Sequence, residues 1–240
     1  MTEDKVKSHF DAIADSYKDE IAGHIRDHLI NKWWGIVKDC FKPDSMVIDI
    51  GCGDGTNVKF LKDKGINIIG VDFSDKLIKR GKERYSELKD LLYQGDALNL
   101  NFSDNTFDIA VMIGVLHHIH SRDEQVAAIQ EAFRVVKDNG VVVIRECNLI
   151  NPVFRVFWNY IFPLTAKIDR FGGENWISAK KLSEIFSGTV EKKDYFTFIP
   201  NFSPHFLLPI AMKIEEFLEK TFFKKLSAHY VVILRKGKGL

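Results

Sequence analysis

The chain has 240 residues, of which 45% are hydrophobic and 28% are charged, and its formal net charge is +1. This length suffices for one globular domain with a sizeable core, and the balanced charge disfavours a nucleic-acid-binding protein with a dense basic surface. No apolar run approaches the ~20 residues of a membrane span. Residues 1–7 precede no apolar signal region, and the three cysteines form no Cys-x-x-Cys pair. We therefore expect a cytoplasmic protein without a disulfide framework or a zinc site.

Predicted strands and helices alternate along most of the chain, after a helix-like segment at residues 3–40. The predicted strands are 46–50, 68–72, 91–94, 107–113, 140–146, 192–199 and 228–235. The predicted helices between them are 56–64, 75–88, 123–137, 178–187 and 204–223. Ser74 is the expected N-cap of the second of these helices, and Gly65 and Gly140 are expected to end the first and the third. This order predicts an α/β fold with a seven-stranded, mostly parallel sheet and helices on both faces.

Two further segments are predicted to cover this sheet. Residues 1–40 form an N-terminal helical cover, and residues 147–180 are too long for a simple connection between strands, so we expect a helical cap. Residues 151–240 contain 14 Lys or Arg against 8 Asp or Glu, and 17 of the 29 aromatic residues of the chain. We therefore expect the substrate to bind beneath this part of a single domain that spans residues 1–240.

Chemically distinctive residues follow each of the first four predicted strands. A glycine-rich turn at 49–55 follows the first, Asp72 ends the second 21 residues beyond Gly51, Asp96 follows the third, and residues 113–118 follow the fourth. In an open parallel sheet these positions line one crevice at the carboxyl ends of the strands. Glycine allows close approach of a ligand to the backbone, and an acidic residue at the distance of Asp72 reaches both hydroxyls of a ribose. Together they predict an adenosine pocket.

The motifs in this region also resemble a known family. They are D-I-G-C-G-D-G at 49–55, G-V-D-F-S at 70–74, Q-G-D-A at 94–97, F-D-I-A-V-M-I-G-V-L-H-H-I at 107–119 and R-V-V-K-D-N-G-V-V-V-I-R-E at 134–146. Their order and spacing over residues 45–147 resemble the class I S-adenosylmethionine-dependent methyltransferases, in particular the small-molecule branch with the ubiquinone- and menaquinone-type enzymes. The segment 10–17 is also similar to that branch. The resemblance implies a Rossmann-like fold and S-adenosyl-L-methionine as the cofactor.

The resemblance further implies a role for each cofactor-binding residue. It places Asp49 and the glycine loop at the amino-acid part of the cofactor and Asp72 on the ribose. Beside the adenine it places Asp96 at the amine, with Phe73, Leu77 and Ala97 as neighbours, although Phe73 and Leu77 also fit plain core positions. Ile113 and Gly114 would line the floor of the cleft, and Tyr17 would close over it. The predicted set is Tyr17, Asp49, Gly51, Cys52, Gly53, Gly55, Asp72, Phe73, Leu77, Asp96, Ala97, Ile113 and Gly114.

Other functions are weighed against this one. An NAD(P)-dependent oxidoreductase would use Asp72 equally well, but its fingerprint needs glycine where this chain has Thr56. Asp49 and Asp54 would also repel its phosphates, whereas they suit a sulfonium and an α-amino group. A regulator that binds S-adenosylmethionine without turnover stays open. Nucleic acid is disfavoured as a substrate, since base methylation usually requires a positive track along the backbone.

Methyl transfer from a sulfonium is an in-line displacement, so correct positioning supplies most of the catalysis, and no metal is expected. A base helps only where the acceptor must lose a proton. His117 and His118 follow the fourth strand, beside the expected methyl group, and histidine titrates near neutral pH. Glu146, at the end of the fifth strand, is the third predicted catalytic residue. Its alternative role is that of a partner for a nearby arginine or backbone amide.

The aromatic residues of the C-terminal part supply the prediction for the substrate. Phe154 and Trp158 have helical spacing and would form an aromatic stripe, which packs either on the sheet or against a ligand. Basic residues surround this region in the sequence. We expect a small apolar or amphiphilic acceptor, lipid-, quinone- or polyketide-like, and peripheral contact of the basic, aromatic cap with a membrane surface. The predicted substrate residues are Phe154, Trp158, Trp176, Phe202 and His205.

Overall fold

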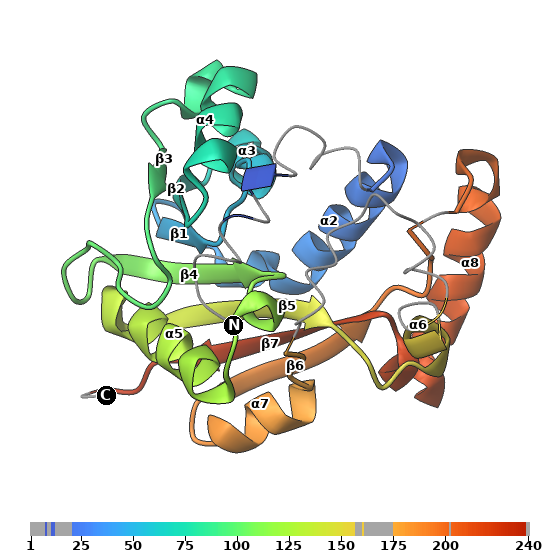
Figure 1. Ribbon diagram of the computed structural model, residues 1–240. Helices are drawn as coiled ribbons and strands as arrows, with labels where there is room; N and C mark the ends of the chain where they lie inside the picture. Colours follow the sequence, from blue (N-terminus) through green and yellow to red (C-terminus); the bar gives the residue numbers. More distant parts are fainter. Residues whose placement is uncertain are drawn as a thin grey trace.

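The structure is a computed structural model that describes residues 8, 11–12, 21–156, 160, 175–201 and 203–238, with only the backbone of residues 153–154. In these ranges seven strands form one sheet, in the order β3-β2-β1-β4-β5-β7-β6 (Figure 1). Neighbouring strands from β3 to β5 are parallel, whereas β7 is antiparallel to both β5 and β6. The strands are β1 Met46–Ile50, β2 Asn67–Asp72, β3 Leu92–Gln94, β4 Phe107–Ile113, β5 Val136–Cys147, β6 Val190–Phe196 and β7 His229–Arg235. The predicted fold is confirmed, with the switch point of strand order between β1 and β4.

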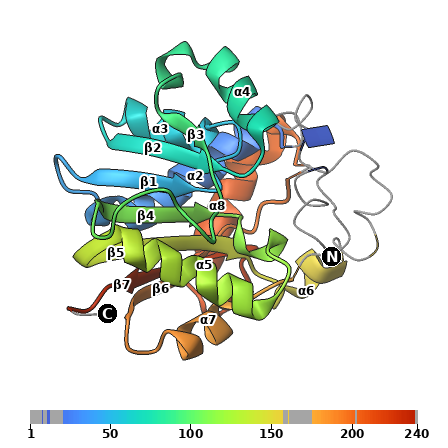
Figure 2. The same ribbon diagram turned by 60° about the vertical axis from the view of Figure 1, so that its left-hand side comes forward.

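Helices cover both faces of this sheet (Figures 1 and 2). One face carries α2 Gly23–Val37, α3 Thr56–Asp63 and α4 Asp75–Arg84, and the other carries α5 Arg122–Val135 and α7 Ala179–Ile185. Two further helices are α6 Pro152–Val156 and α8 Leu208–Glu219. The 3₁₀ turns are η2 Lys38–Cys40, η3 Ser86–Leu88, η4 Leu116–His118, η7 His205–Leu207 and η8 Phe222–Leu226. No helix within the described ranges has the length and apolar character to cross a bilayer.

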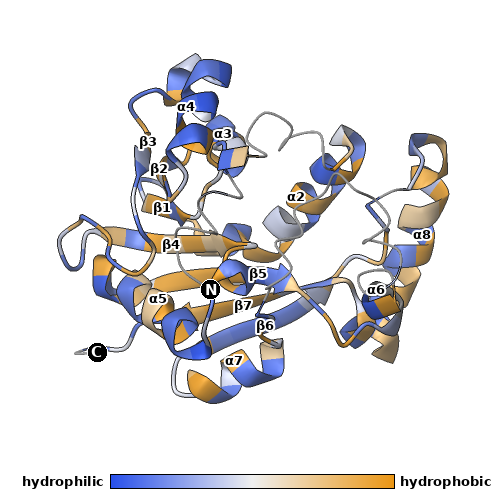
Figure 3. Ribbon diagram, viewed as in Figure 1, coloured by the Kyte–Doolittle hydropathy of each residue, from blue (hydrophilic) through white to orange (hydrophobic). Residues whose placement is uncertain are grey.

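The central strands are apolar on both faces because helices bury both sides. Figure 3 shows this as continuous hydrophobic stretches along β4, β5 and β7. One core cluster joins β4 and β5 to α5 and α7, and a second joins the opposite face to α2, α3 and α4. A third, smaller cluster at Ile25, Leu29 and Ile199 packs α2 against Leu208 and Ala211 of α8. Because both faces are buried, the edges of the sheet are where a ligand can reach the strands.

A buried carboxylate reinforces the contact between α2 and α8. Glu215 of α8 accepts hydrogen bonds from His28 (2.8 Å) and Lys32 (2.7 Å) of α2, and from the hydroxyl of Thr197 (2.5 Å). Burial alone would raise the pKa of this carboxyl, but the hydrogen bonds and the charge of Lys32 lower it to about 2. Glu215 therefore stays ionised and joins both helices to the end of β6.

Local signals in the sequence explain most element ends, and two expectations need correction. Ser74 caps α4 by accepting the Leu77 N–H (3.1 Å), and Gly65, with φ +80°, follows α3 as expected. Gly140 does not end a helix, because α5 stops at Val135 and Gly140 lies within β5, where a Cβ would come 2.6 Å from the Asp108 carbonyl oxygen of β4. The predicted helix 204–223 is divided into η7, α8 and η8.

Candidate active site

The residues predicted to bind the cofactor follow strands that end at one edge of the sheet (Figures 1 and 2). Ile50 at the end of β1 pairs with Val71 of β2 on one side and Met112 of β4 on the other. Ile113 at the end of β4 pairs with Arg145 of β5. The loops after β1, β2, β4 and β5 therefore stand side by side, as the crevice of an open α/β sheet requires.

The glycine-rich turn after β1 is folded so that its backbone lies against the neighbouring loop. Gly51, Gly53 and Gly55 have φ of +76°, +56° and +76°, and a Cβ on Gly51 would come 2.4 Å from Val115. Asp54 lies within the turn, but Arg84 neutralises its carboxylate at 2.6 Å. Asp54 therefore serves the structure of the turn, and the negative charge expected from it is already paired.

Asp49 is a buried carboxylate that has no hydrogen-bond partner in the described ranges. Its side chain is 0% exposed, and neither oxygen has a hydrogen-bond partner within the described part of the chain. Burial, and then the negative charge of Asp72, raise the pKa of Asp49 to about 7. A buried, unpaired acid is costly unless a ligand completes it. An ammonium group such as the α-amino group of an amino acid would supply both the charge and the hydrogen bonds.

Asp72 is held in one orientation at the end of β2. Its Oδ2 accepts the Gly53 N–H (2.8 Å) and its Oδ1 accepts the Ser74 N–H (2.9 Å). Burial raises the pKa of Asp72, while these two hydrogen bonds oppose the rise. Each carboxylate oxygen can accept a further bond. The geometry thus offers two acceptors to a pair of vicinal hydroxyls.

The other predicted cofactor residues take mixed positions. Asp96 accepts the Leu98 N–H (2.8 Å), and Ala97 packs at the margin of a core cluster. Phe73 is half-buried, whereas Leu77 is fully buried, and the Cys52 side chain packs in the core where β2 has Gly70. Ile113 and Gly114 end β4 beside Arg145. Tyr17 lies outside the described residues.

The three predicted catalytic residues lie together after β4 and β5. His117 Nδ1 lies 2.6 Å from Glu146 Oε2, and Glu146 Oε1 accepts the Leu116 N–H at 2.7 Å. The side chains of His117 and Glu146 are buried. The ring centroids of His117 and His118 are 3.9 Å apart. A carboxylate bonded to Nδ1 fixes the tautomer with the proton on Nδ1 and the lone pair on Nε2. This arrangement suits a general base.

Trp176 joins this group from the far end of the predicted cap. Its indole stacks on the His117 ring with centroids 4.3 Å apart and planes 5° from parallel. Three polar residues that the sequence did not single out hold it there. The Asn175 N–H donates to the His117 carbonyl (2.8 Å), and the Gln125 amide donates to the Asn175 carbonyl (2.5 Å). Arg122 donates to the carbonyl of Trp176 itself (2.9 Å). Gln125 is fully buried near the start of α5. A polar side chain on the apolar face of that helix was the signal that could have revealed it.

The remaining predicted substrate residues are not brought to this group. His205 is exposed, and its ring lies 5.2 Å from that of His24 on α2. Trp158 and Phe202 lie outside the described residues, and Phe154 lies in α6 without a described side chain. Of the predicted substrate set, Trp176 is the residue that the described structure brings to His117.

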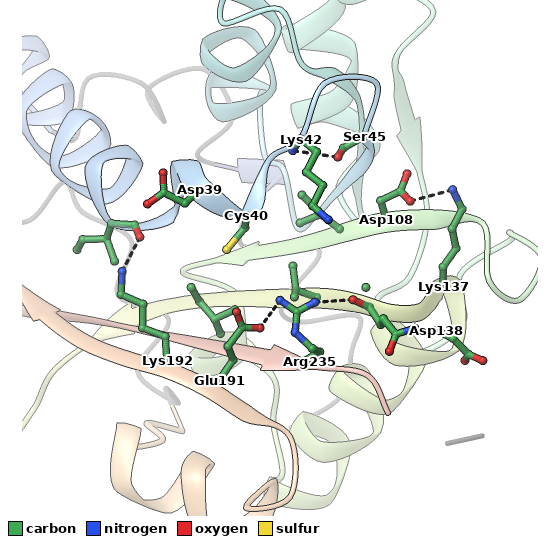
Figure 4. A pocket seen from close by; sticks show the side chains of 16 residues that line it. Asp39, Cys40, Lys42, Ser45, Asp108, Lys137, Asp138, Glu191, Lys192 and Arg235 are labelled. Carbon is green, nitrogen blue, oxygen red and sulfur yellow. Dashed lines mark hydrogen bonds and ion pairs between the residues drawn. The ribbon is translucent and has the colours of Figure 1, made fainter. Parts of the chain in front are cut away.

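A cavity of about 500 Å³ lies at the opposite edge of the sheet, at the amino ends of β1, β4 and β5 (Figure 4). Lys137 pairs with Asp108 at 2.9 Å, and Arg235 pairs with Glu191 at 2.5 Å. None of the predicted site residues lines it. Its charged groups largely neutralise one another, so its volume alone does not mark it as the functional site.

Residues 48–144 match the family described as the methyltransferase domain. This stretch is similar to methyltransferase domains. It contains every predicted cofactor residue apart from Tyr17. The buried, unpaired Asp49, the fixed Asp72 and the bare glycine turn fit the amino group, ribose and backbone of S-adenosylmethionine, which is the cofactor that the domain and the geometry support. Within the described residues, no cluster of three His, Cys, Asp or Glu could hold a metal ion.

Known relatives of the methyltransferase domain act on different acceptors. A demethylmenaquinone methyltransferase of Paenarthrobacter aurescens (strain TC1) is 32% identical over 146 residues, which cover 60% of this chain and 55% of that protein. A tRNA (carboxymethyluridine(34)-5-O)-methyltransferase of Arabidopsis thaliana is 34% identical over 132 residues, or 52% of this chain and 30% of that protein. The chain therefore spans about half or less of these curated relatives.

A solved structure supports the fold over a longer stretch. The SAM-dependent methyltransferase of Archaeoglobus fulgidus superposes with a TM-score of 0.62 at 19% identity, over 87% of this chain and 94% of that one. At this identity the likeness establishes the Rossmann-like methyltransferase fold, and it extends well beyond residues 48–144.

Proposed function

We propose that the protein transfers the methyl group of S-adenosylmethionine to a small, apolar or amphiphilic acceptor of the quinone type, and that residues 1–240 act as one domain with covers at 1–40 and 147–180. The observation that carries this proposal is the hydrogen-bonded pair of His117 and Glu146 directly after the floor residues of β4. Such a pair is useful where the acceptor must lose a proton. The 32% identity to a demethylmenaquinone methyltransferase supports the acceptor class.

The residues divide the chemistry between binding and proton removal. S-adenosylmethionine, when bound, supplies the methyl group and a sulfonium whose positive charge is lost during transfer. Asp49 and Asp72 would hold its amino group and its ribose. His117 would accept the acceptor's proton at Nε2, while Glu146 stabilises the resulting imidazolium. General-base catalysis of this kind contributes about 10²–10⁴-fold to a rate.

The direct test is transfer of isotope-labelled methyl groups from S-adenosylmethionine to a short-chain demethylmenaquinol. We expect a labelled lipid-soluble product with the wild-type protein and none with the Asp72→Ala variant. A different result would favour the non-catalytic regulator. In that case the protein binds S-adenosylhomocysteine in calorimetry but labels no acceptor in a lysate extract.

A tRNA acceptor is the second candidate, and the relative in Arabidopsis thaliana is the observation that favours it. A uridine with a carboxymethyl group is also an acceptor with an ionisable group. The same labelling reaction with total tRNA in place of the quinol separates the two candidates, since the label then enters an RNase-sensitive, acid-precipitable fraction.

We also propose peripheral contact with an anionic membrane surface, as expected for an amphiphilic acceptor. Half of the predicted cap lies outside the described residues, and α8 and η7 supply the support for this contact. Phe206, Ile210, Ile214 and Phe217 recur at helical spacing and are 55–76% exposed. We call these four residues the α8 stripe; Figure 3 shows the hydrophobic stretches of α8. A band of this width on one helix face is typical of helices that lie in a lipid interface.

Positive charge accompanies the α8 stripe. Lys213 and Lys225 are exposed and have no carboxylate partner in the described part of the chain, whereas Lys220 and Lys224 pair with Glu216 and Asp194. Phe222, which precedes Lys224 and Lys225, is 81% exposed. Apolar side chains beside uncompensated lysines complement an anionic bilayer better than an apolar protein surface.

A further inference from the structure

Arg145 is an arginine whose guanidinium has no polar partner among the described residues. Within the described residues no carboxylate or carbonyl oxygen accepts a hydrogen bond from it, whereas Arg84, Arg122 and Arg134 each donate to at least one. Arg145 stands near the end of β5, where its own carbonyl accepts the Gly114 N–H at 2.9 Å. Arg145 therefore stands beside the end of β4, next to Ile113 and Gly114.

The surroundings of Arg145 make this lack of a partner costly. The side chain is half-buried, its Cζ lies 5.9 Å from the centre of the buried Phe196 ring, and burial lowers its pKa. Arginine stays charged in proteins, so it cannot escape the cost by releasing its proton. A partly desolvated guanidinium is stabilised best by an anion that accepts two parallel hydrogen bonds.

His229 provides a second polar group on the same face of the sheet. His229 is the first residue of β7 and pairs with Cys147 of β5, which lies on the same face of that strand as Arg145. The centre of the His229 ring is 5.7 Å from the centre of the Phe196 ring. His229 is 6% exposed, and its Nδ1 has no hydrogen-bond partner within the described residues. Burial, and then the charge of Arg145, hold its pKa well below the usual value, so the ring is neutral.

The neighbouring charges leave room for an anion at this point. Glu215 acts on His229 from α8, but its carboxylate is already bonded to Lys32 and His28. His117 contributes, with Arg145, to lowering the pKa of His229. Glu146 follows Arg145 in β5 and is bonded to His117. Both nearby carboxylates therefore already have hydrogen-bond partners, whereas the Arg145 guanidinium and the Nδ1 atom of His229 have none among the described residues.

We propose that Arg145 and His229 bind an acidic group of the acceptor, a carboxylate or a phenolate, and thereby orient the acceptor toward His117. This inference rests on the proposed function, because it assigns a role within the same cleft. Arg145 would hold the anion with its two-pronged guanidinium, and His229 would add one hydrogen bond. A site of this kind suits both acceptor candidates, since a hydroquinone and a carboxymethylated uridine each carry an ionisable oxygen.

The test measures binding of acidic and neutral probes to the protein loaded with S-adenosylhomocysteine. The small-molecule arm uses 1-hydroxy-2-naphthoate and methyl 1-methoxy-2-naphthoate, which has neither a free carboxyl nor a free phenol. The nucleoside arm uses 5-carboxymethyluridine and uridine. We expect at least one acidic probe to bind at least tenfold more tightly than its neutral counterpart. Arg145→Gln should remove that difference, Arg145→Lys should retain part of it, and His229→Phe should reduce it several-fold. The arm that responds identifies the source of the acid.

Two controls keep this result separate from folding and from the proposed function. Arg235→Gln removes an arginine at the opposite edge and should leave all probe affinities within twofold. S-adenosylhomocysteine affinity and the thermal midpoint, measured for each variant, report on the cofactor site and on folding. Equal binding of acidic and neutral probes, or an unchanged preference in a folded Arg145→Gln protein, overturns the inference and leaves the proposed function standing. Failure of the wild-type protein to bind S-adenosylhomocysteine counts against the proposed function instead.

Discussion

The two edges of the sheet differ in how completely their polar groups are paired. At the amino edge, a cavity of about 500 Å³ is lined by ions that neutralise each other, such as Lys137 with Asp108. At the carboxyl edge, Asp49 and His229 are buried and have polar atoms without a hydrogen-bond partner in the described structure. Arg145 is half-buried, and its guanidinium also has no hydrogen-bond partner there. Folding free energy is small, so uncompensated buried groups persist where something outside the chain completes them. Incomplete pairing therefore identifies the functional edge better than volume does.

The largest expected effect is on cofactor affinity. Asp72→Ala removes two acceptors for the ribose, each worth about 1.5–3 kcal/mol when the acceptor is charged, so S-adenosylhomocysteine should bind at least about 100-fold more weakly. Asp108→Ala is the matched change at the amino edge and should alter affinity less than twofold. Calorimetry on both variants decides, and similar losses in the two would erase the distinction between the edges.

The next effect is on turnover. His117→Ala should lower the rate of methyl transfer by about 100-fold or more without changing cofactor affinity, because a general base contributes about 10²–10⁴-fold. Glu146→Gln should lower the rate less than His117→Ala does and should change the pH profile. The reason is that this substitution keeps the His117 imidazole and alters only its basicity. His205→Ala, on the α2 side, should stay within twofold. Steady-state rates across pH, with thermal midpoints as a folding check, provide the measurement.

A smaller effect concerns pH. The raised pKa of Asp49, about 7, means that the ligand-free protein carries a proton there below neutral pH, and an ammonium ligand binds the ionised form. Affinity for S-adenosylhomocysteine should therefore rise with pH, by about tenfold between pH 6 and pH 8, with release of a proton on binding. Asp49→Asn should bind more weakly and lose this dependence. Calorimetry in buffers of different ionisation enthalpy detects the proton, and uptake of a proton on binding would contradict the assignment.

The smallest effect concerns the membrane surface. Lys213→Gln and Lys225→Gln should each weaken sedimentation with phosphatidylserine-containing liposomes about fivefold at low salt, because a basic residue near an anionic surface contributes about 1 kcal/mol. Lys137→Gln, at the amino edge, should have no effect. If the wild-type protein stays in the supernatant with these liposomes, the α8 stripe has another partner.

Much of the fold, and the grouping of several candidate site residues at one edge of the sheet, followed from the sequence because their signals are local. The glycine turn, Asp72 and the His117 motif each sit at the end of an apolar strand, and parallel strands bring such ends together whatever the rest of the chain does. Residue pairs that depend on register were out of reach. Arg145 and His229 come together through the antiparallel pairing of β5 with β7, and Trp176 reaches His117 through contacts of Asn175.

Some expectations were wrong for physical reasons that one sequence hides. Gly140 was expected to end a helix, but its position is set by the close approach of the β4 backbone. His205 follows the sixth strand and was expected near the site, whereas η7 places it beside His24. β6 runs in the same direction as β5, so its end lies at the carboxyl edge as well. The chain after β6 nevertheless carries His205 to α2, and the course of that connection depends on packing that the sequence does not reveal.

The hydrogen bonds of Glu215 have a mechanical consequence. Separating α8 from α2 would break the ion pair between Glu215 and Lys32, and breaking a buried ion pair by removing one partner costs about 3–5 kcal/mol. The two helices therefore move as a rigid pair, fastened to Thr197 at the end of β6. A pull on the outer surface of α8 is transmitted through these contacts to α2, whose Trp33 packs in the same core cluster as β1, Cys52 of the glycine turn and β2.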